Sequence, residues 1–404
     1  MSPHHPNSPL RTAVVGTGGI ARGSHLPALR TLAAEGATEI VAAVDVDADA
    51  VGAFADEAGI PYASSDLDAM LTDVRPDLVV LCTPPAVHRA QSVAALRAGA
   101  WVWCEKPPCP SLADYDAVEA AEKGGDDGKD SKDGDAGPYA SIVFQHRFGS
   151  GARHVRRLLR EGAFGRPLVA HCQTTWYRDA AYYAVPWRGR WATEGGGPAM
   201  GHGIHQTDLL LDLMGPWSEV RGMAARLVHD VESEDVSTAQ VRFANGAVAT
   251  VVNSVLSPDE VSRIRIDCER ATIELTHLYG YRNADWRITP APGVDEAAVA
   301  AWRDFGPDEP SSHLAQLRAL VADIRAGRRH ATSGAGGRRT LEFITALYKS
   351  AFTETPVRAG EIGPGDPYYT ALHGGAPGWA PAEALQTDIP QPEAGARKEE
   401  EEHA

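Results

Sequence analysis

The N-terminal third of the chain alternates short, continuously apolar runs with stretches of helical character, and this order constrains the fold more than any other feature. The apolar runs are predicted strands, at 12–16, 39–44, 77–82, 101–105 and 139–145, and predicted helices lie at 47–58, 66–73 and 86–98. Strands that are apolar throughout are typical of a parallel sheet covered by helices on both faces. The pattern therefore predicts a doubly wound α/β domain.

Beyond residue 150 the sequence changes style. Segments within 168–277 alternate apolar and polar residues, and Ala244-Asn245-Gly246 between two of them is typical of a hairpin turn. We predict a C-terminal α+β domain with a large, mostly antiparallel open sheet, one face of which is free to meet another subunit. Two late helices are predicted near 312–326 and 338–353.

These changes of pattern give the predicted boundaries. The first domain spans 11–147 and contains an insertion at 124–138 that is rich in glycine and charge, which predicts disorder. The second domain spans 148–356. Residues 1–10 are predicted to be disordered, and residues 357–404 form a Pro/Gly-rich and acidic tail.

Charge and composition exclude several classes of partner. The formal net charge of −16 repels phosphate backbones, which argues against nucleic acid. The sequence has no apolar run long enough for a membrane span and no secretory signal, so we predict no membrane partner and a cytoplasmic location. The five cysteines are scattered without a C-x-x-C pair, and we predict no metal.

A glycine-rich turn follows the first predicted strand and opens a helix. Gly16 permits the tight turn, Gly18 and Gly19 let backbone approach a pyrophosphate, and Ile20 and Ala21 begin the helix. The N–H groups of a helix N-terminus, together with its partial positive charge, suit phosphates. This context predicts a dinucleotide-binding Rossmann domain.

Asp45 ends the second predicted strand, where a carboxylate can accept hydrogen bonds from both hydroxyls of the adenine ribose. It would repel a 2′-phosphate, and no arginine follows it directly, so NAD is favoured over NADP. The alternative role for Asp45 is a helix N-cap, which Asp47 or Asp49 can fill instead.

Two further strands end in segments that should border the nicotinamide half of the cofactor, because ligands lie outside the carboxyl ends of parallel strands. One segment supplies Thr83, Pro84 and His88, and the other supplies Glu105 and Lys106. Lys106 precedes a proline, which favours extended geometry and presents its ammonium at the strand end.

Residues 11–356 resemble the glucose–fructose oxidoreductase/inositol dehydrogenase/MocA (Gfo/Idh/MocA) family. The resemblance is carried by GTGGIA at 16–21, TPPAVH at 83–88, EKP at 105–107 and EGGGPAMGHGIHQTDLL at 194–210. It implies a Rossmann domain, a C-terminal α/β domain whose open sheet serves oligomerisation as a homodimer or homotetramer, and reversible oxidation of a sugar or cyclitol hydroxyl. Lys106 and His205 match the lysine and histidine that family members place at the reacting carbon.

The family pattern usually carries an aspartate four residues before this histidine, and here that position is Gly201. His202 either replaces the missing carboxylate in part or lies in the pocket wall. The surrounding glycines, Gly195–Gly197 and Gly203, indicate backbone kept clear for a ligand.

We expect His205 to take the hydroxyl proton as hydride leaves, while Lys106 stabilises the developing charge on the same oxygen. The reverse assignment, with Lys106 as base, stays open. Asp208, one helical turn further on, is expected to accept the other ring N–H of His205 or to contact substrate. Trp187 and Arg188 are candidate substrate contacts, by stacking and by hydrogen bonding.

Two other functions compete with an NAD-linked sugar or inositol dehydrogenase. One is an NAD-dependent glycosidase of the same fold that uses transient oxidation, and the missing aspartate is the reason to consider it. The other is a non-catalytic sensor of NAD or sugar, against which the presence of both Lys106 and His205 argues.

Overall fold

The computed structural model describes residues 8–122 and 137–381. Most of the predicted N-terminal disorder, nearly all of the insertion predicted at 124–138 and the acidic end of the tail therefore lie outside the described residues. Within the described ranges, no helix is both long and apolar enough to cross a membrane.

The first domain is a six-stranded parallel sheet with the order β3-β2-β1-β4-β5-β6, which confirms the predicted doubly wound fold. Its strands are β1 Leu10–Val15, β2 Thr38–Val44, β3 Tyr62–Ser64, β4 Leu78–Leu81, β5 Trp101–Cys104 and β6 Ala140–Ile142. The π-helical turn η1 Ala21–His25 leads into α1 Leu26–Ala34, and the other helices are α2 Ala48–Ala58, α3 Leu67–Val74, α4 Pro85–Arg97 and α5 Leu112–Glu122.

The two faces of this sheet bury separate apolar clusters. Side chains of α1 and α2 pack on one face, and those of α3, α4 and α5 pack on the other. The second cluster continues into the core of the C-terminal domain. The two domains therefore share one apolar core on that side of the parallel sheet.

The second sheet has eight strands in the order β13-β12-β11-β7-β10-β9-β8-β14. Its strands are β7 Pro167–Tyr177, β8 Trp217–Ala225, β9 Val236–Phe243, β10 Val248–Ser254, β11 Leu256–Cys268, β12 Ala271–His277, β13 Trp286–Pro290 and β14 Val357–Arg358. Only β7 and β10 pair in parallel; the other neighbours are antiparallel, as expected. The predicted turn at Asn245-Gly246 joins β9 to β10, and Gly246 has a φ of +89° there.

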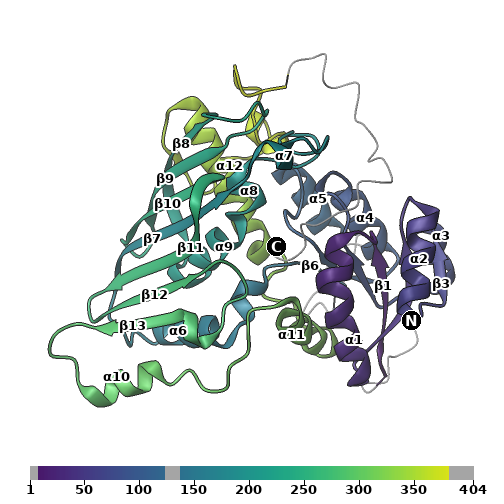
Figure 1. The fold of residues 1–404 in the computed structure, drawn as a ribbon, viewed down its shortest axis with the longest axis horizontal. Coiled ribbons are helices and arrows are strands. Elements are labelled where there is room, and N and C mark those ends of the chain that lie inside the picture. The colour runs from purple at the N-terminus through teal and green to yellow at the C-terminus, as the bar shows by residue number, and fades with distance from the viewer. Residues whose placement is uncertain (1–7, 123–136, 382–404) are drawn as a thin grey trace.

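Helices cover one face of this sheet and connect it to the first domain. They are α6 Ser150–Arg160, α9 Ile204–Met214 and α12 Ala335–Thr353. Helix α12 contacts both β8 and α5, so it lies between the second sheet and the Rossmann domain (Figure 1). The shorter elements are η2 Gln145–Phe148, α7 Ala180–Tyr183, α8 Pro198–Gly201, η3 Asn283–Asp285, α10 Glu296–Arg303 and α13 Pro367–Thr370.

Helix α11, His313–Arg325, departs from the predicted domain boundaries. It packs against α1, and Leu317, Leu320 and Val321 are buried in the apolar cluster of the first domain. The chain thus returns to the Rossmann domain after building most of the second sheet (Figure 1). An amphipathic pattern indicates that a helix covers a core, but it does not say which core.

The predicted tail also begins too early. β14 extends the second sheet beside β8, and Trp379 stacks on Phe352 of α12 with ring centroids 4.3 Å apart. The indole N–H of Trp191 donates to the carbonyl of Trp379 at 2.8 Å. Residues 357–381 are therefore part of the C-terminal domain.

Candidate active site

The glycine-rich turn has the backbone geometry that a dinucleotide requires. Gly16 has a φ of +86°, and a Cβ there would lie 2.8 Å from the carbonyl carbon of Cys82, so only glycine fits. A Cβ on Gly18 would meet nothing within 4 Å, which leaves open space in front of the turn. Gly19 and Ile20 follow immediately, before η1. The turn and the helix start therefore fit a pyrophosphate.

Asp45 lies at the end of β2 and is bonded to the same turn. Its Oδ2 accepts hydrogen bonds from the backbone N–H of Thr17 at 2.7 Å and from the Thr17 hydroxyl at 3.0 Å. The N-cap of α2 is Asp47, whose side chain accepts from the N–H groups of Asp49 and Ala50. Asp45 is therefore not the helix cap, and its half-buried carboxylate lies beside the glycine turn.

His88 joins the two strand-end segments. Its Nδ1 lies 2.9 Å from the carbonyl oxygen of Pro107, and its Nε2 lies 2.7 Å from that of Thr83. Both ring nitrogens of this fully buried side chain are thus engaged with backbone, which corrects the prediction that His88 itself binds the cofactor. It instead fixes the loop that carries Thr83 and Pro84 against the loop that follows Lys106.

Glu105 is also directed inward rather than toward a cofactor. Its Oε1 accepts hydrogen bonds from Nε2 of His25 at 2.7 Å and of His313 at 3.1 Å. The three ligand atoms lie within 4.8 Å of one another, a spacing that suits a metal ion, but these direct hydrogen bonds already pair them. Burial alone would raise the pKa of Glu105; the two histidines outweigh it and hold that pKa well below its usual range. The cluster ties η1, β5 and α11 together.

Lys106 extends from this cluster to the second domain. Its Nζ donates to the carbonyl oxygen of Gly201 at 3.1 Å, across 95 residues of sequence. Burial lowers the pKa of the ammonium, as does nearby Arg188, while Glu105 and Glu194 raise it in part. The lysine is therefore half-buried at the point where the two domains meet.

His205 lies in the first turn of α9 and is 5% exposed. Burial, the charge of Lys106 and the neighbouring His146 all hold its pKa well below the usual value, so the imidazole is neutral. Its Nδ1 is buried and has no hydrogen-bond partner among the described residues. A neutral imidazole with an unused nitrogen, within the field of an ammonium, is equipped to handle a proton.

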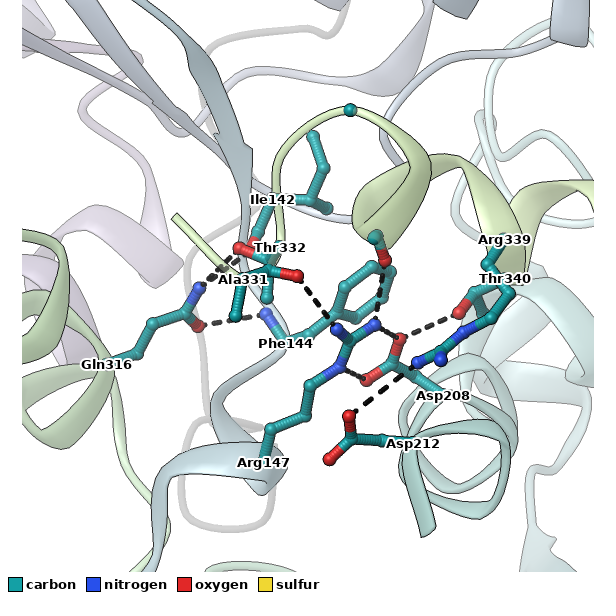
Figure 2. Close-up of polar contacts among 12 residues, drawn as sticks. Ile142, Phe144, Arg147, Asp208, Asp212, Gln316, Ala331, Thr332, Arg339 and Thr340 are labelled. Atoms are coloured by element: carbon teal, nitrogen blue, oxygen red, sulfur yellow. Dashed lines mark hydrogen bonds and ion pairs between the residues drawn. The ribbon is translucent and has the colours of Figure 1, made fainter. Parts of the chain in front are cut away.

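Asp208 does not orient His205, contrary to the prediction. Its carboxylate accepts hydrogen bonds from Nε of Arg147 at 2.6 Å, from Nη2 of Arg147, and from the Thr340 hydroxyl at 2.7 Å (Figure 2). The side chain is 1% exposed, and both of its carboxylate oxygens are already paired within the protein. Spacing on a helix indicates which residues share a face. The hydrogen-bond partner of Asp208 is instead Arg147, which comes from η2.

Two of the glycines before His205 are required by contacts within the protein rather than by space for a ligand. A Cβ on Gly197 would lie 2.0 Å from the carbonyl oxygen of Glu234, and one on Gly203 would lie 2.0 Å from Oδ1 of Asn253. The buried carboxylate of Glu234 accepts from the N–H groups of Gly197 and Ala199 at the start of α8. Close packing thus explains Gly197 and Gly203, and it fixes the segment that presents Gly201 and His205.

Arg188 and Trp187 precede this segment, and Arg188 is in contact with it through Glu194. The Arg188 guanidinium lies 3.8 Å from the ring centroid of Tyr182 and 4.2 Å from that of Trp187, and its Nη1 bonds Oε1 of Glu194 at 3.2 Å. Trp187 is 40% exposed, so its indole is accessible. No role could be assigned from the sequence to Tyr182, which no motif marks, or to Glu194, which opens the 194–210 motif.

His202 packs among the aromatic side chains near Arg188. Its ring is 5.0 Å from that of Trp176, and its Nε2 lies 3.5 Å from the Tyr182 hydroxyl. Burial and the charges of Arg178, Lys106 and Arg188 hold its pKa well below the usual value. His202 therefore packs against Trp176 and Tyr182 with an uncharged ring.

His146 and Tyr279 close the site on the other side of His205. Their ring centroids lie 5.0 Å and 5.7 Å from that of His205. Burial, His313 and Lys106 lower the pKa of His146 to about 3. His146 follows β6, but Tyr279 comes from the loop after β12, and only the fold brings it here.

Comparison with known proteins assigns both domains to one family. The NAD-binding Rossmann model of the GFO/IDH/MocA oxidoreductases matches residues 10–126, and the C-terminal domain model of the same family matches 152–274. The D-glucoside 3-dehydrogenase of Escherichia coli K12 is 26% identical, covering 87% of this chain and 98% of its own. The myo-inositol 2-dehydrogenase of Thermotoga maritima is 25% identical, covering 79% and 90%.

A solved structure gives the same result. The WlbA dehydrogenase of Chromobacterium violaceum, in complex with NADH and UDP-GlcNAcA, superposes with a TM-score of 0.73 and is 26% identical, covering 88% of this chain and 97% of that one. The Rossmann domain here is thus an NAD-binding one, and the relatives are dehydrogenases of sugars and cyclitols. The chain belongs to the GFO/IDH/MocA family and is an NAD-binding oxidoreductase of the sugar and cyclitol dehydrogenase type.

Proposed function

We propose that this protein transfers hydride between NAD and a secondary hydroxyl of a sugar or cyclitol, with Lys106 and His205 at the reacting carbon. One observation carries the proposal: the Lys106 ammonium reaches the carbonyl of Gly201 at 3.1 Å, beside a neutral, buried His205. Both groups come from segments that meet only where the two domains join.

The cofactor would be held by Gly16, Gly18, Gly19, Ile20 and Asp45, with Thr83 and Pro84 at the nicotinamide end. The open space at Gly18 and the carboxylate of Asp45 beside the turn support this assignment. When bound, NAD supplies the acceptor for the hydride.

His205 takes the hydroxyl proton while the C–H bond breaks, so that a free alkoxide never forms. Lys106 donates a hydrogen bond to the same oxygen and stabilises the charge that develops on it. The products are a ketone, the reduced cofactor and a proton on His205. In the reverse assignment Lys106 is the base, which its lowered pKa makes chemically accessible.

Substrate hydroxyls would contact Arg188 and His202, with Trp187 stacking on the C–H face of the ring. Arg188 suits this role because Tyr182 and Glu194 hold its guanidinium beside the Lys106 site. Trp187 packs against the Arg188 guanidinium and is 40% exposed.

The proposal is tested by NADH absorbance with a panel of sugars, cyclitols and uronates, with NAD and NADP in parallel. Net NADH formation with a free polyol is the expected result, faster with NAD. Cleavage of a glycoside without net NADH would indicate the glycosidase instead. Binding of NAD and sugar with no turnover of either kind would leave only a sensor.

The open face of the second sheet is proposed to pair with a second copy of the chain, giving a homodimer or homotetramer. Val169 and Val248 are neighbours across β7 and β10, and they are 36% and 40% exposed there. Analytical ultracentrifugation of Val169→Glu/Val248→Glu should give a smaller species than wild type. Val228→Glu, on an exposed loop, is the matched control. A wild-type monomer would contradict the proposal.

A further inference from the structure

The proposed mechanism leaves one buried carboxylate beside Lys106 without a role. Glu194 precedes α8, and its side chain is 11% exposed. Its Oε2 accepts from the backbone N–H of Gly189 at 2.6 Å, and its Oε1 accepts from Arg188 at 3.2 Å. These bonds fix the carboxylate in the substrate half of the site.

The location of Oε1 is informative. A Cβ built on Gly201 would meet one atom within 4 Å, and that atom is Oε1 of Glu194 at 4.0 Å. The carbonyl oxygen of Gly201 is the acceptor of the Lys106 ammonium. A Cβ on Gly195 would likewise lie 4.0 Å from Cγ of Pro107, so the 194–195 segment packs against the lysine loop. The carboxylate of Glu194 therefore borders the open space into which a side chain at 201 would project.

Glu194 and Lys106 each shift the pKa of the other toward its charged form. Burial raises the pKa of Glu194, and the Gly189 N–H, Arg188 and Lys106 oppose that effect. In turn, the carboxylate raises the pKa of Lys106 against burial and Arg188. Glu105 also raises the pKa of Lys106, but its carboxylate is hydrogen-bonded to His25 and His313.

We propose that Glu194 supplies, from a different position in the chain, the carboxylate that is absent at Gly201, and that it acts as the positioning residue for Lys106. This inference rests on the proposed dehydrogenase function. Glu194 keeps Lys106 charged and directed at the oxygen that loses its proton. A second carboxylate at 201 would face the first at close range, and two like charges there would repel, which accounts for the glycine.

The test removes the carboxylate at position 194 and introduces one at position 201. Glu194→Gln keeps an acceptor for the Gly189 N–H but removes the charge, and we expect kcat to fall ~10- to 100-fold, as for residues that orient a catalytic group. NAD affinity should not change. In the Glu194→Gln background, Gly201→Asp should recover a large part of kcat, whereas Gly201→Ala, which adds a side chain without charge, should not.

The pH profile separates a positioning role from a structural one. Without the carboxylate, the pKa of Lys106 should fall, so its limb in the profile of kcat/KM should move to lower pH. Glu194→Gln/Gly201→Asp should move it back. The groups facing Lys106 are Glu105, Glu194, Arg188, His202, His205 and His146. Of these groups only Glu194 is altered, and the double variant adds one carboxylate at 201.

A Glu194→Gln enzyme with the kcat and pH profile of wild type would overturn the inference, as would equal rescue by Asp and Ala at 201. Failure of the proposed function gives a different result, in which wild type itself forms no NADH with any substrate. The inference then has its own readout: after reductive ¹³C-methylation, the NMR resonance absent in Lys106→Arg should titrate at lower pH in Glu194→Gln. An unchanged titration would overturn it.

Discussion

The two halves of the site are built in different ways. In the cofactor half, backbone does the positioning: Gly16 needs a positive φ, Gly18 leaves open space, and the strand ends carry Thr83 and Lys106. In the substrate half, side chains from separate elements hold one another, as Arg188 is held by Tyr182 and Glu194. A position where backbone geometry requires glycine can be recognised in the sequence as a motif. Side chains from separate elements that hold one another in place leave no such motif.

The largest effect should separate catalysis from cofactor binding. We expect Lys106→Ala to lower kcat by ~10²–10⁴-fold, because it removes the cation that stabilises charge on the reacting oxygen. NAD affinity, measured by quenching of protein fluorescence, should stay close to wild type, since the glycine turn is untouched. Weakened NAD binding with an undiminished kcat would contradict the assignment of Lys106 to catalysis rather than to cofactor binding.

Asp208 lies in the same helix as His205, but we expect it to contribute to stability rather than to catalysis. Asp208→Asn leaves Arg147 buried without its counter-charge, which typically costs about 3–5 kcal/mol. Denaturant unfolding should report that loss, and the folded enzyme at low temperature should keep most of its kcat. Thr340→Val, which removes one neutral hydrogen bond to the same carboxylate, should cost only about 1 kcal/mol. A stable Asp208→Asn protein with a large loss of kcat would reverse this assignment.

The substrate half should also limit stability in acid. Folding lowers the pKa of His146 to about 3, and the pKa values of His202 and His205 are lowered as well. Below the ordinary histidine pKa the unfolded chain therefore binds more protons, and stability falls as pH falls. For His146 the loss of stability between pH 6.5 and pH 5 should be about 1.5–2 kcal/mol, and His202 and His205 should add to it in the same direction. His146→Gln should flatten the pH dependence of unfolding; an unchanged slope would contradict this origin.

The smallest effect concerns cofactor choice. Asp45→Ala should reduce the preference for NAD over NADP by roughly 10- to 100-fold, which corresponds to one charged hydrogen bond to the ribose. Asp45→Asn should fall between Ala and wild type, because the amide keeps an acceptor for the Thr17 N–H. The ratio of kcat/KM values for the two cofactors measures this directly. An unchanged ratio in Asp45→Ala would remove Asp45 from the ribose site.

The same distinction explains what could be predicted from sequence. Both sheets and the turn at Asn245-Gly246 follow from patterns of local spacing. The contact of Lys106 with the 194–210 segment is what the family resemblance implies, and no local spacing predicts it. The domain to which α11 belongs does not, because its apolar stripe fits either core. The partner of Asp208 does not follow either, since Arg147 lies 61 residues away and no local rule links them.

Two further differences between the sequence-based predictions and the structure also arise from long-range contacts. The glycines at 197 and 203 were interpreted as space for a ligand, but Glu234 and Asn253 approach them from other elements. Glu194 stood inside a recognised motif and still had no predicted role, because its carboxylate becomes meaningful only beside Gly201. In each case the missing information is a long-range contact rather than a local preference.

A double-mutant cycle on Lys106 and His205 tests the central claim most directly, by NADH formation with the best substrate found. If both groups act on one oxygen, Lys106→Ala/His205→Ala should lose little more kcat than either single variant, since groups that work as a unit are strongly non-additive. Losses that multiply would mean that the two residues act independently, and that result would contradict a shared site at the reacting carbon.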